Sequence, residues 1–223
     1  MVHPTDAPLQ DTASHEPSPA TRPGGSRLAT RALAALLLVP CAPVIGVLGL
    51  GVALSMGRPI LFRQERSGLH QARFTLFKLR SMRSAFNAAG APLPDEARVT
   101  GLGKFLRRSR LDELPGLWNV VRGDMAFVGP RPLLPETIAQ LGERGRQRAR
   151  VRPGLTGWSQ VNGNTLLSLD EKVALDMCYI DNASPRLDMQ ILLRTFWVML
   201  GGERRAPKIE TPRVKACPSD AAE

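Results

Sequence analysis

Two adjacent carboxylates, Asp112 and Glu113, follow the arginine-rich segment Arg107–Arg110. Apolar residues that recur from Leu114 with helical spacing predict a short amphipathic helix beginning at Asp112, with Pro115 in its first turn. A helix N-terminus offers free N–H groups and positive potential, and nearby guanidinium groups add to it. Both effects favour ionised carboxylates, so the pair is a candidate for nucleophilic attack on a phosphate held by the same field. The structural alternative is that Asp112 caps the helix and Glu113 supports its dipole.

Arg131 is the leading candidate for a phosphate clamp. It lies in the segment Gly129–Pro132, between two prolines that restrict the backbone on either side of it. A preset loop holding a guanidinium suits bidentate phosphate recognition, because less conformational freedom remains to be lost on binding. A surface arginine on a rigid turn would show the same pattern.

Two further cations, Lys78 and Arg80, end a predicted strand. The segments Ile60–Gln64 and Arg73–Arg80 both have the composition of strands, joined by a turn near Gly68. Because side chains alternate along a strand, Lys78 and Arg80 lie on one face, at the end of an apolar stripe. The two cations are therefore candidates for phosphate binding, and a solvated strand end is the alternative.

A glycine-rich segment, Arg152–Gly163, contains Trp158 and Gln160, and Asp176 follows it in a predicted helix. Glycines allow a ligand to approach the backbone closely, while Trp158 and Gln160 suit contact with a base, a sugar or the membrane interface. These two residues and Asp176 are candidates for substrate binding. Taken alone, the segment is only a glycine-rich loop.

The composition argues against several other kinds of site. The chain of 223 residues has a formal charge of +10, so its surface attracts nucleic acid, lipid headgroups or a phosphorylated substrate. Its 3 histidines and 3 cysteines have no metal-ligand spacing, so carboxylates, arginines and lysines must supply the chemistry. With 1 tyrosine and 3 tryptophans it lacks a stacking array, and we expect no nucleic-acid partner.

An uncharged run from Ala32 to Met56 is long enough to cross a bilayer. Pro40 and Pro43 stand in its middle, and each removes a backbone donor and bends a helix, which leaves two halves that are too short to span alone. Arginines flank the run on both sides, which favours keeping both ends in the cytoplasm. We therefore expect a re-entrant hairpin. The alternatives are a kinked spanning helix and a signal peptide, and the long polar leader argues against the signal peptide.

The rest of the chain divides by composition. Residues 1–26 and 203–223 are polar, broken by prolines and without apolar periodicity, so we expect disordered tails. Residues 27–57 form the anchor and residues 58–202 one domain, α+β in class and mostly helical, with a short β-hairpin. A predicted helix from Leu187 to Leu200 has an apolar face that suits the headgroup region of a membrane, and a core helix is the alternative.

These segments together resemble the bacterial sugar transferase family, the small monotopic phosphoglycosyl transferases. The resemblance runs from the anchor to about Leu200 and rests on several motifs that occur in the right order and spacing. The motifs are Phe62-Arg63-Gln64-Glu65-Arg66, Phe77-Lys78-Leu79-Arg80-Ser81-Met82, Leu111-Asp112-Glu113-Leu114-Pro115, Gly129-Pro130-Arg131-Pro132 and Arg152-Pro153-Gly154-Leu155-Thr156-Gly157-Trp158.

The resemblance implies a re-entrant membrane helix broken by a proline, here Pro43, and a compact cytosolic domain that lies on the membrane with amphipathic helices. In such enzymes the Asp-Glu pair is catalytic with Mg2+. The aspartate attacks the β-phosphate of a UDP-sugar, UMP leaves, and polyprenyl phosphate takes the phosphosugar. Asp112 matches the nucleophile, and Glu113 matches the metal-binding or basic partner.

Lys78, Arg107 and Arg131 match cationic positions around the phosphates in this family. The physical chemistry agrees, because two phosphates and a carboxylate nucleophile meet without repulsion only if Mg2+ and arginines neutralise them. The resemblance also implies the cytoplasmic face of the bacterial inner membrane as the location. The implied role is the first membrane step in assembling an exopolysaccharide, capsule, O-antigen or glycoprotein glycan.

Two departures from the family pattern leave the donor sugar open. Arg110 replaces a commonly small residue, and Asn164 stands where an arginine often follows Val-Asn-Gly. The expected partners are a UDP-sugar, polyprenyl phosphate and the membrane, and a homodimer stays open. The competing interpretations are a catalytically silent member of the family, although Asp112 and Glu113 are both present, and a basic membrane-tethered binding protein.

Overall fold

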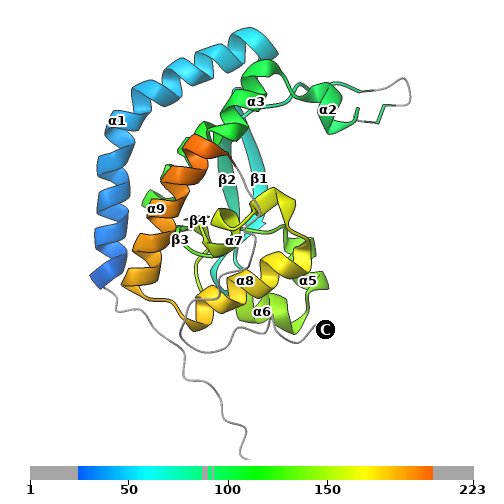
Figure 1. Ribbon diagram of the computed structural model, residues 1–223. Helices are drawn as coiled ribbons and strands as arrows, with labels where there is room; N and C mark the ends of the chain where they lie inside the picture. Colours follow the sequence, from blue (N-terminus) through cyan, green and yellow to red (C-terminus); the bar gives the residue numbers. More distant parts are fainter. Residues whose placement is uncertain (1–24, 87–89, 92, 203–223) are drawn as a thin grey trace, which may run out of the picture.

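The computed structural model describes residues 25–86, 90–91 and 93–202, and it has mixed helix and strand, as the sequence predicts. The predicted tails, 1–26 and 203–223, lie outside the described residues, except that Gly25 begins the first helix. Figure 1 shows a small domain with this helix, α1 (Gly25–Met56), arching along one side and over one end of it.

Helix α1 contains the apolar run that the sequence predicts to be the anchor. It is continuous with Pro40 and Pro43 inside it, and Figure 1 shows one bent helix instead of two helices joined by a turn. A proline removes one backbone hydrogen bond and bends the helix, but the turns on either side of it remain helical. Residues Leu28–Met56 are long and apolar enough to cross a membrane by length and composition. The re-entrant course of α1 stays a prediction.

Both ends of α1 pack on the same domain. Near its start, Ala34 is buried in a cluster with the β-hairpin, and Arg31 Nε donates to the carbonyl of Val121 at 2.8 Å. Near its end, Val52 is buried against Leu106. The two halves therefore share the core of the domain. Other side chains of α1 are apolar and exposed, among them Leu36, Val39, Val47, Leu50 and Leu54.

The β-hairpin lies where the sequence predicts it. Strands β1 (Leu61–Ser67) and β2 (Arg73–Leu79) pair antiparallel, with Phe62 opposite Lys78. A short 3-10 helix, η1 (Leu69–Gln71), reverses the chain between them. The hairpin places Lys78 near the end of β2, next to the segment that carries the carboxylate pair.

The remaining elements follow the hairpin in chain order. They are α2 (Asp95–Arg98), α3 (Gly101–Arg108), η2 (Leu111–Gly116), α4 (Leu117–Arg122), β3 (Ala126–Val128), α5 (Pro135–Gln140), α6 (Glu143–Arg148), β4 (Gly154–Thr156), α7 (Trp158–Val161), η3 (Asn164–Leu166), α8 (Leu169–Asp181) and α9 (Pro185–Gly201).

Strands β3 and β4 form a parallel pair that the sequence did not indicate. The pairing is close: a Cβ atom at Gly154 would lie 2.1 Å from the backbone nitrogen of Gly129, so only glycine fits there. The glycine-rich segment therefore supports backbone packing. It brings the loop at Gly129–Pro132 against the start of α7.

Helices α8 and α9 enclose the main apolar cluster. Trp158, Tyr179 and Ile191 are almost fully buried in it. Helix α8 begins at a capping box in which Ser168 accepts from the backbone of Glu171 and the Glu171 side chain accepts in return.

The predicted helix start at Asp112 is wrong. Asp112 lies in the 3-10 helix η2, and the α-helical run begins only at Leu117. Pro115 and Gly116 are the poorest helix formers, which accounts for the delayed start. Arg110, with a φ of 55°, turns the chain between α3 and η2. The carboxylate pair therefore stands on a tight turn.

Helix α9 exposes an apolar face, as its sequence periodicity indicates. The opposite face packs on the core through Leu187 and Ile191, which are buried. Phe196 and Trp197 are 58% and 68% exposed, and their rings meet edge to face. The other exposed apolar residues of this face are Met189, Leu192, Leu193 and Leu200. Contact of this face with a membrane stays a prediction.

Candidate active site

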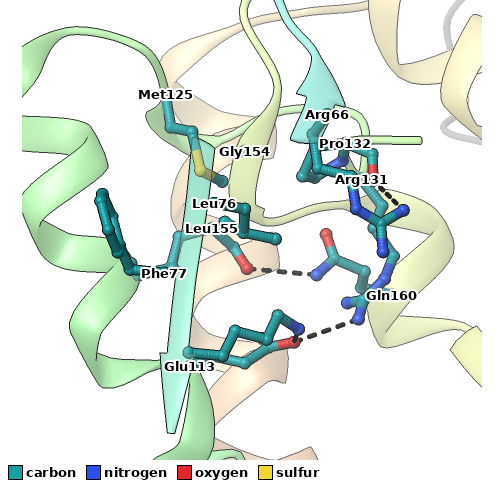
Figure 2. Close-up of a pocket in the computed structure, with 12 residues that line it drawn as sticks. Arg66, Leu76, Phe77, Glu113, Met125, Arg131, Pro132, Gly154, Leu155 and Gln160 are labelled. Atoms are coloured by element: carbon teal, nitrogen blue, oxygen red, sulfur yellow. Dashed lines mark hydrogen bonds and ion pairs between the residues drawn. The ribbon is translucent and has the colours of Figure 1, made fainter. Parts of the chain in front are cut away.

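A cleft lies between the hairpin, η2 and the loop after β3 (Figure 2). Its lining residues are Arg66, Leu76, Phe77, Lys78, Glu113, Gly116, Met125, Arg131, Pro132, Gly154, Leu155 and Gln160. Arg66, Lys78 and Arg131 are cations, whereas Glu113 is the acidic residue of this lining. The cleft is therefore positive and suits an anion.

Glu113 is the centre of the ion pairs in this cleft. Lys78 Nζ lies 2.6 Å from Glu113 Oε1, and Arg131 Nη2 lies 3.1 Å from the same oxygen. Burial works to raise the pKa of Glu113, but the charges of Arg131 and Lys78 outweigh it and lower that pKa to about 2. Glu113 is therefore ionised at neutral pH.

Asp112 has the opposite electrostatic environment. Burial and the negative charge of Glu113 raise the pKa of Asp112 to about 6, against the opposing charges of Lys78, Arg131 and Arg107. The sequence predicts that Asp112 stays ionised, and a pKa of about 6 leaves it mostly ionised at pH 7. The neighbouring arginines do not lower that pKa overall, because the closest cations pair with Glu113 and the buried Asp112 adjoins a second negative charge.

The phosphate-clamp candidate Arg131 is held by two other arginines. Arg148 Nη2 donates to the carbonyl of Arg131, and Arg66 Nη1 donates to the carbonyl of Pro132 at 3.2 Å. Gly129 also donates to the carbonyl of Thr156 at 2.9 Å, which ties the loop to β4. The loop is therefore fixed by more than its prolines.

Arg80 and Arg107 do not line the cleft. Arg80 is 8% exposed and donates to the carbonyls of Met56 and Gly57, at the end of α1. Arg107 Nε donates to Ser81 Oγ at 2.9 Å. Arg107 still acts on Asp112 through its charge, whereas Arg80 holds the end of α1.

Of the three residues predicted to bind other parts of the substrate, only Gln160 lines the cleft. Its Nε2 donates to the carbonyl of Leu155, and its buried Oε1 has no hydrogen-bond partner within the described part of the chain. Trp158 is 1% exposed in the core, with Arg194 over its ring. Asp176 is 1% exposed and pairs with Arg148 at 2.6 Å, so Trp158 and Asp176 lie in the supporting structure.

Sequence reasoning did not select Arg66 as a cleft residue. The motif that contains it is mostly polar, so its composition does not show which arginine points inward. The alternation of side chains along the strand could have shown it, because it puts Arg66 and its exposed neighbour Glu65 on opposite faces.

Asp112 and Glu113 have the chemistry of ligands for an Mg2+ ion that binds together with a phosphorylated substrate. Among the described residues, no three His, Cys, Asp or Glu side chains gather into a metal cage. Mg2+ is usually held by one or two carboxylates, with substrate phosphates and water completing its octahedral shell. Glu113 lines the positive cleft, and the adjacent Asp112 is buried and is not one of its lining residues.

The fold and this cleft define a domain with an apolar N-terminal helix and an acidic pair at a cationic site. The sequence profile of the family described as bacterial sugar transferase matches residues 24–202. The chain belongs to the bacterial sugar transferase family.

Several curated relatives agree with this assignment. "Uncharacterized sugar transferase EpsL" of Bacillus subtilis (strain 168) is 43% identical over 171 residues, which cover 76% of this chain and 85% of the relative. "UDP-glucose:undecaprenyl-phosphate glucose-1-phosphate transferase" of Escherichia coli (strain K12) is 39% identical, over 77% of this chain and 40% of the relative. "UDP-N-acetylgalactosamine-undecaprenyl-phosphate N-acetylgalactosaminephosphotransferase" of Aeromonas hydrophila is 34% identical, over 76% and 42%.

The chain spans less than half the length of the two relatives whose names state an activity, at 40% and 42%. Those names support the general reaction of a transferase that uses undecaprenyl phosphate, and they differ in the sugar. Together with the apolar helix α1, they suggest association with a membrane.

Proposed function

We propose that this protein transfers a sugar 1-phosphate from a UDP-sugar to undecaprenyl phosphate and releases UMP. The observation that carries the proposal is the pairing of Glu113 with Lys78 and Arg131, which leaves Asp112 beside a cationic cleft with its own pKa raised. The names of the relatives support the same donor and acceptor classes.

In the proposed first step, a carboxylate oxygen of Asp112 attacks the β-phosphorus of the UDP-sugar. The bond from that phosphorus to the bridging oxygen breaks, and the electron pair leaves with UMP. A carboxylate with a pKa of about 6 is mostly ionised at pH 7, at a ratio of about ten to one. It is also more basic than an ordinary aspartate, which suits a nucleophile.

In the second step, an oxygen of undecaprenyl phosphate attacks the phosphorus of the aspartyl phosphosugar. Asp112 leaves as a carboxylate, and the lipid carries the sugar diphosphate. Arg131 and Lys78 would hold phosphate oxygens in both steps, since preorganised cations stabilise the charge that develops on them. Mg2+ bound by Glu113 and Asp112 would neutralise the diphosphate and make UMP a better leaving group.

The proposed location is the cytoplasmic face of a bacterial inner membrane, with α1 entering one leaflet and returning. The burial of both Ala34 and Val52 against one domain supports this course, because a spanning helix would carry one of them away from the domain. A cysteine introduced at Gln10 in a chain without its native cysteines is expected to react only with reagents that reach the cytoplasm. Labelling of Gln10→Cys from the periplasm would instead show a spanning helix.

The reaction is tested with a panel of UDP-sugars and undecaprenyl phosphate, by measuring UMP release from membranes that contain the protein. We expect UMP release with at least one donor and none from Asp112→Asn. Absence of release across a broad panel would favour a catalytically silent family member. The same panel identifies the sugar, which the relatives leave open because their names give different sugars.

A further inference from the structure

We propose that Arg66, together with Arg131, forms a second phosphate-binding position in the cleft, beside the one at Lys78. The inference rests on the proposed function, since the ligand is a phosphate group of one of its two substrates. It gives Arg66 a role that the motifs and the comparisons leave unassigned.

The side chain of Arg66 is held in place by the protein itself. Its Nη1 donates to the carbonyl of Pro132 at 3.2 Å, and its Nη2 donates to Gln64 Oε1. Its Nε is buried and has no hydrogen-bond partner among the described residues, whereas Nη1 and Nη2 each carry a second N–H. Figure 2 shows Arg66 and Arg131 on the same side of the cleft. Arg66 is thus a fixed guanidinium with donor capacity left for a ligand.

No carboxylate in the described part of the chain forms an ion pair with Arg66. The ion pairs of the cleft join Lys78 and Arg131 to Glu113. Burial lowers the pKa of Arg66, and the positive charge of Arg131 lowers it further. Two partly buried cations that repel each other raise the free energy of the free protein, so an anion between them would bind favourably.

A phosphate group fits this position better than a neutral ligand. Phosphate oxygens only accept hydrogen bonds when ionised, and guanidinium groups present donors in a planar fork that matches them. The UDP-sugar has two phosphates and the lipid acceptor has one, so either substrate has the required chemistry. The structural alternative is that Arg66 only braces the carbonyl of Pro132.

The test uses the full chain in lipid nanodiscs and compares Arg66→Gln and Arg66→Lys with a matched control. Arg73→Gln removes the same charge from the same hairpin, where Arg73 is exposed and pairs with the exposed Glu65. Four quantities are measured for each variant: UMP affinity by calorimetry, exchange of labelled UMP into UDP-sugar without acceptor, the KM for undecaprenyl phosphate, and the Tm.

If Arg66 holds the donor's α-phosphate, Arg66→Gln weakens UMP binding and slows exchange by about tenfold or more, as expected for a lost charged hydrogen bond. If it holds the β-phosphate, exchange slows by a similar factor and UMP binding is unchanged. If it holds the acceptor phosphate, exchange is unchanged and the KM for undecaprenyl phosphate rises by a similar factor. In each case Arg66→Lys recovers part of the loss, because it keeps the charge.

The proposal is overturned if Arg66→Gln matches Arg73→Gln in UMP affinity, exchange and acceptor KM, even where its Tm falls. That result would leave only the brace on Pro132. If the wild-type protein shows no exchange or transfer, the proposed function fails. In that case the effect of Arg66→Gln on UMP affinity still tests binding of the donor phosphate that UMP keeps, and a UMP affinity equal to that of Arg73→Gln overturns the proposal.

Discussion

The ammonium group of Lys78 lies 2.6 Å from Oε1 of Glu113. Because of this contact, the two adjacent carboxylates have very different pKa values. The nearby cations Lys78 and Arg131 pair with Glu113, so its pKa falls to about 2 although burial opposes this. Asp112 is left buried beside a negative charge, and its pKa rises to about 6. One residue of the pair therefore stays charged, while its neighbour has the basicity that the proposed nucleophile requires.

The acid limb of the pH profile is expected to report Asp112. In a two-step reaction, kcat/KM for the UDP-sugar depends on the first step alone, so it should fall about tenfold per pH unit below about pH 6, as Asp112 becomes protonated. Glu113→Gln removes a charge that raises the pKa of Asp112. Its acid limb should therefore move to lower pH, while its maximum rate falls. An unmoved limb would mean that another group titrates there.

Arg80 is expected to stabilise the fold without binding substrate. Arg80→Met removes charged hydrogen bonds to the end of α1 and should lower the free energy of unfolding by about 2 kcal/mol. The KM for the UDP-sugar should be unchanged. Arg83→Met is the control, since exposed Arg83 donates to the nearby carbonyl of Ser55. A raised KM for the UDP-sugar in Arg80→Met, without a lower Tm, would show that Arg80 does bind a substrate phosphate.

The sequence predicted the elements that have strong periodicity. The hairpin and α9 lie within a few residues of their predicted ranges, and α8 is the helix that was predicted to contain Asp176. Strands β3 and β4 were missed, because three residues carry no readable alternation and their pairing depends on long-range contact at Gly154.

The candidate site was predicted less completely than the fold. The sequence selected Lys78, Glu113, Arg131 and Gln160 as site residues, and the structure places all of them in one cleft. Sequence spacing alone cannot show which polar residues satisfy each other inside the protein. Asp176 therefore had the appearance of a substrate ligand, although it pairs with Arg148 from a helix that the sequence did not indicate.

Asp176 is expected to stabilise the folded protein instead of binding substrate. Arg148 donates to Asp176 Oδ2, and Ser159 donates to Oδ1 at 2.7 Å, with the charged pair fully buried. Removing one partner of such a pair costs about 3–5 kcal/mol, so Asp176→Ala should unfold far earlier in urea. Asp170→Ala on the same helix is the control, because its ion pair with Arg144 is exposed. Equal midpoints for the two variants would contradict a structural role for Asp176.

The exposed face of α9 is expected to enter the lipid headgroup region. Trp197 is 68% exposed while Trp158 is buried, so brominated lipids in nanodiscs should quench the emission of Trp197 and leave that of Trp158. Trp197→Phe should therefore lose most of the quenchable emission. Trp118→Phe is compared with it, since Trp118 is 48% exposed on α4. Quenching that Trp197→Phe leaves unchanged would place α9 away from the lipid.

The last prediction is that Asp112 forms a covalent phosphosugar intermediate, which makes the reaction two displacements at phosphorus. The raised pKa gives Asp112 the basicity of a nucleophile, and Glu113, Lys78 and Arg131 provide fixed charges around the phosphate. In a direct transfer, by contrast, Asp112 would serve only as a base and no exchange could occur without the lipid.

The two mechanisms separate in protein that has been freed of lipid acceptor. The covalent route permits exchange of labelled UMP into UDP-sugar, and it adds the mass of a sugar phosphate to the peptide that contains Asp112. Asp112→Asn should abolish both signals, because an amide oxygen is a poor nucleophile, whereas Glu113→Gln should weaken exchange in a way that higher Mg2+ partly restores. If acceptor-free protein is active once lipid is added and still shows neither exchange nor adduct, direct attack by the lipid phosphate is the better account, and Asp112 acts as a base.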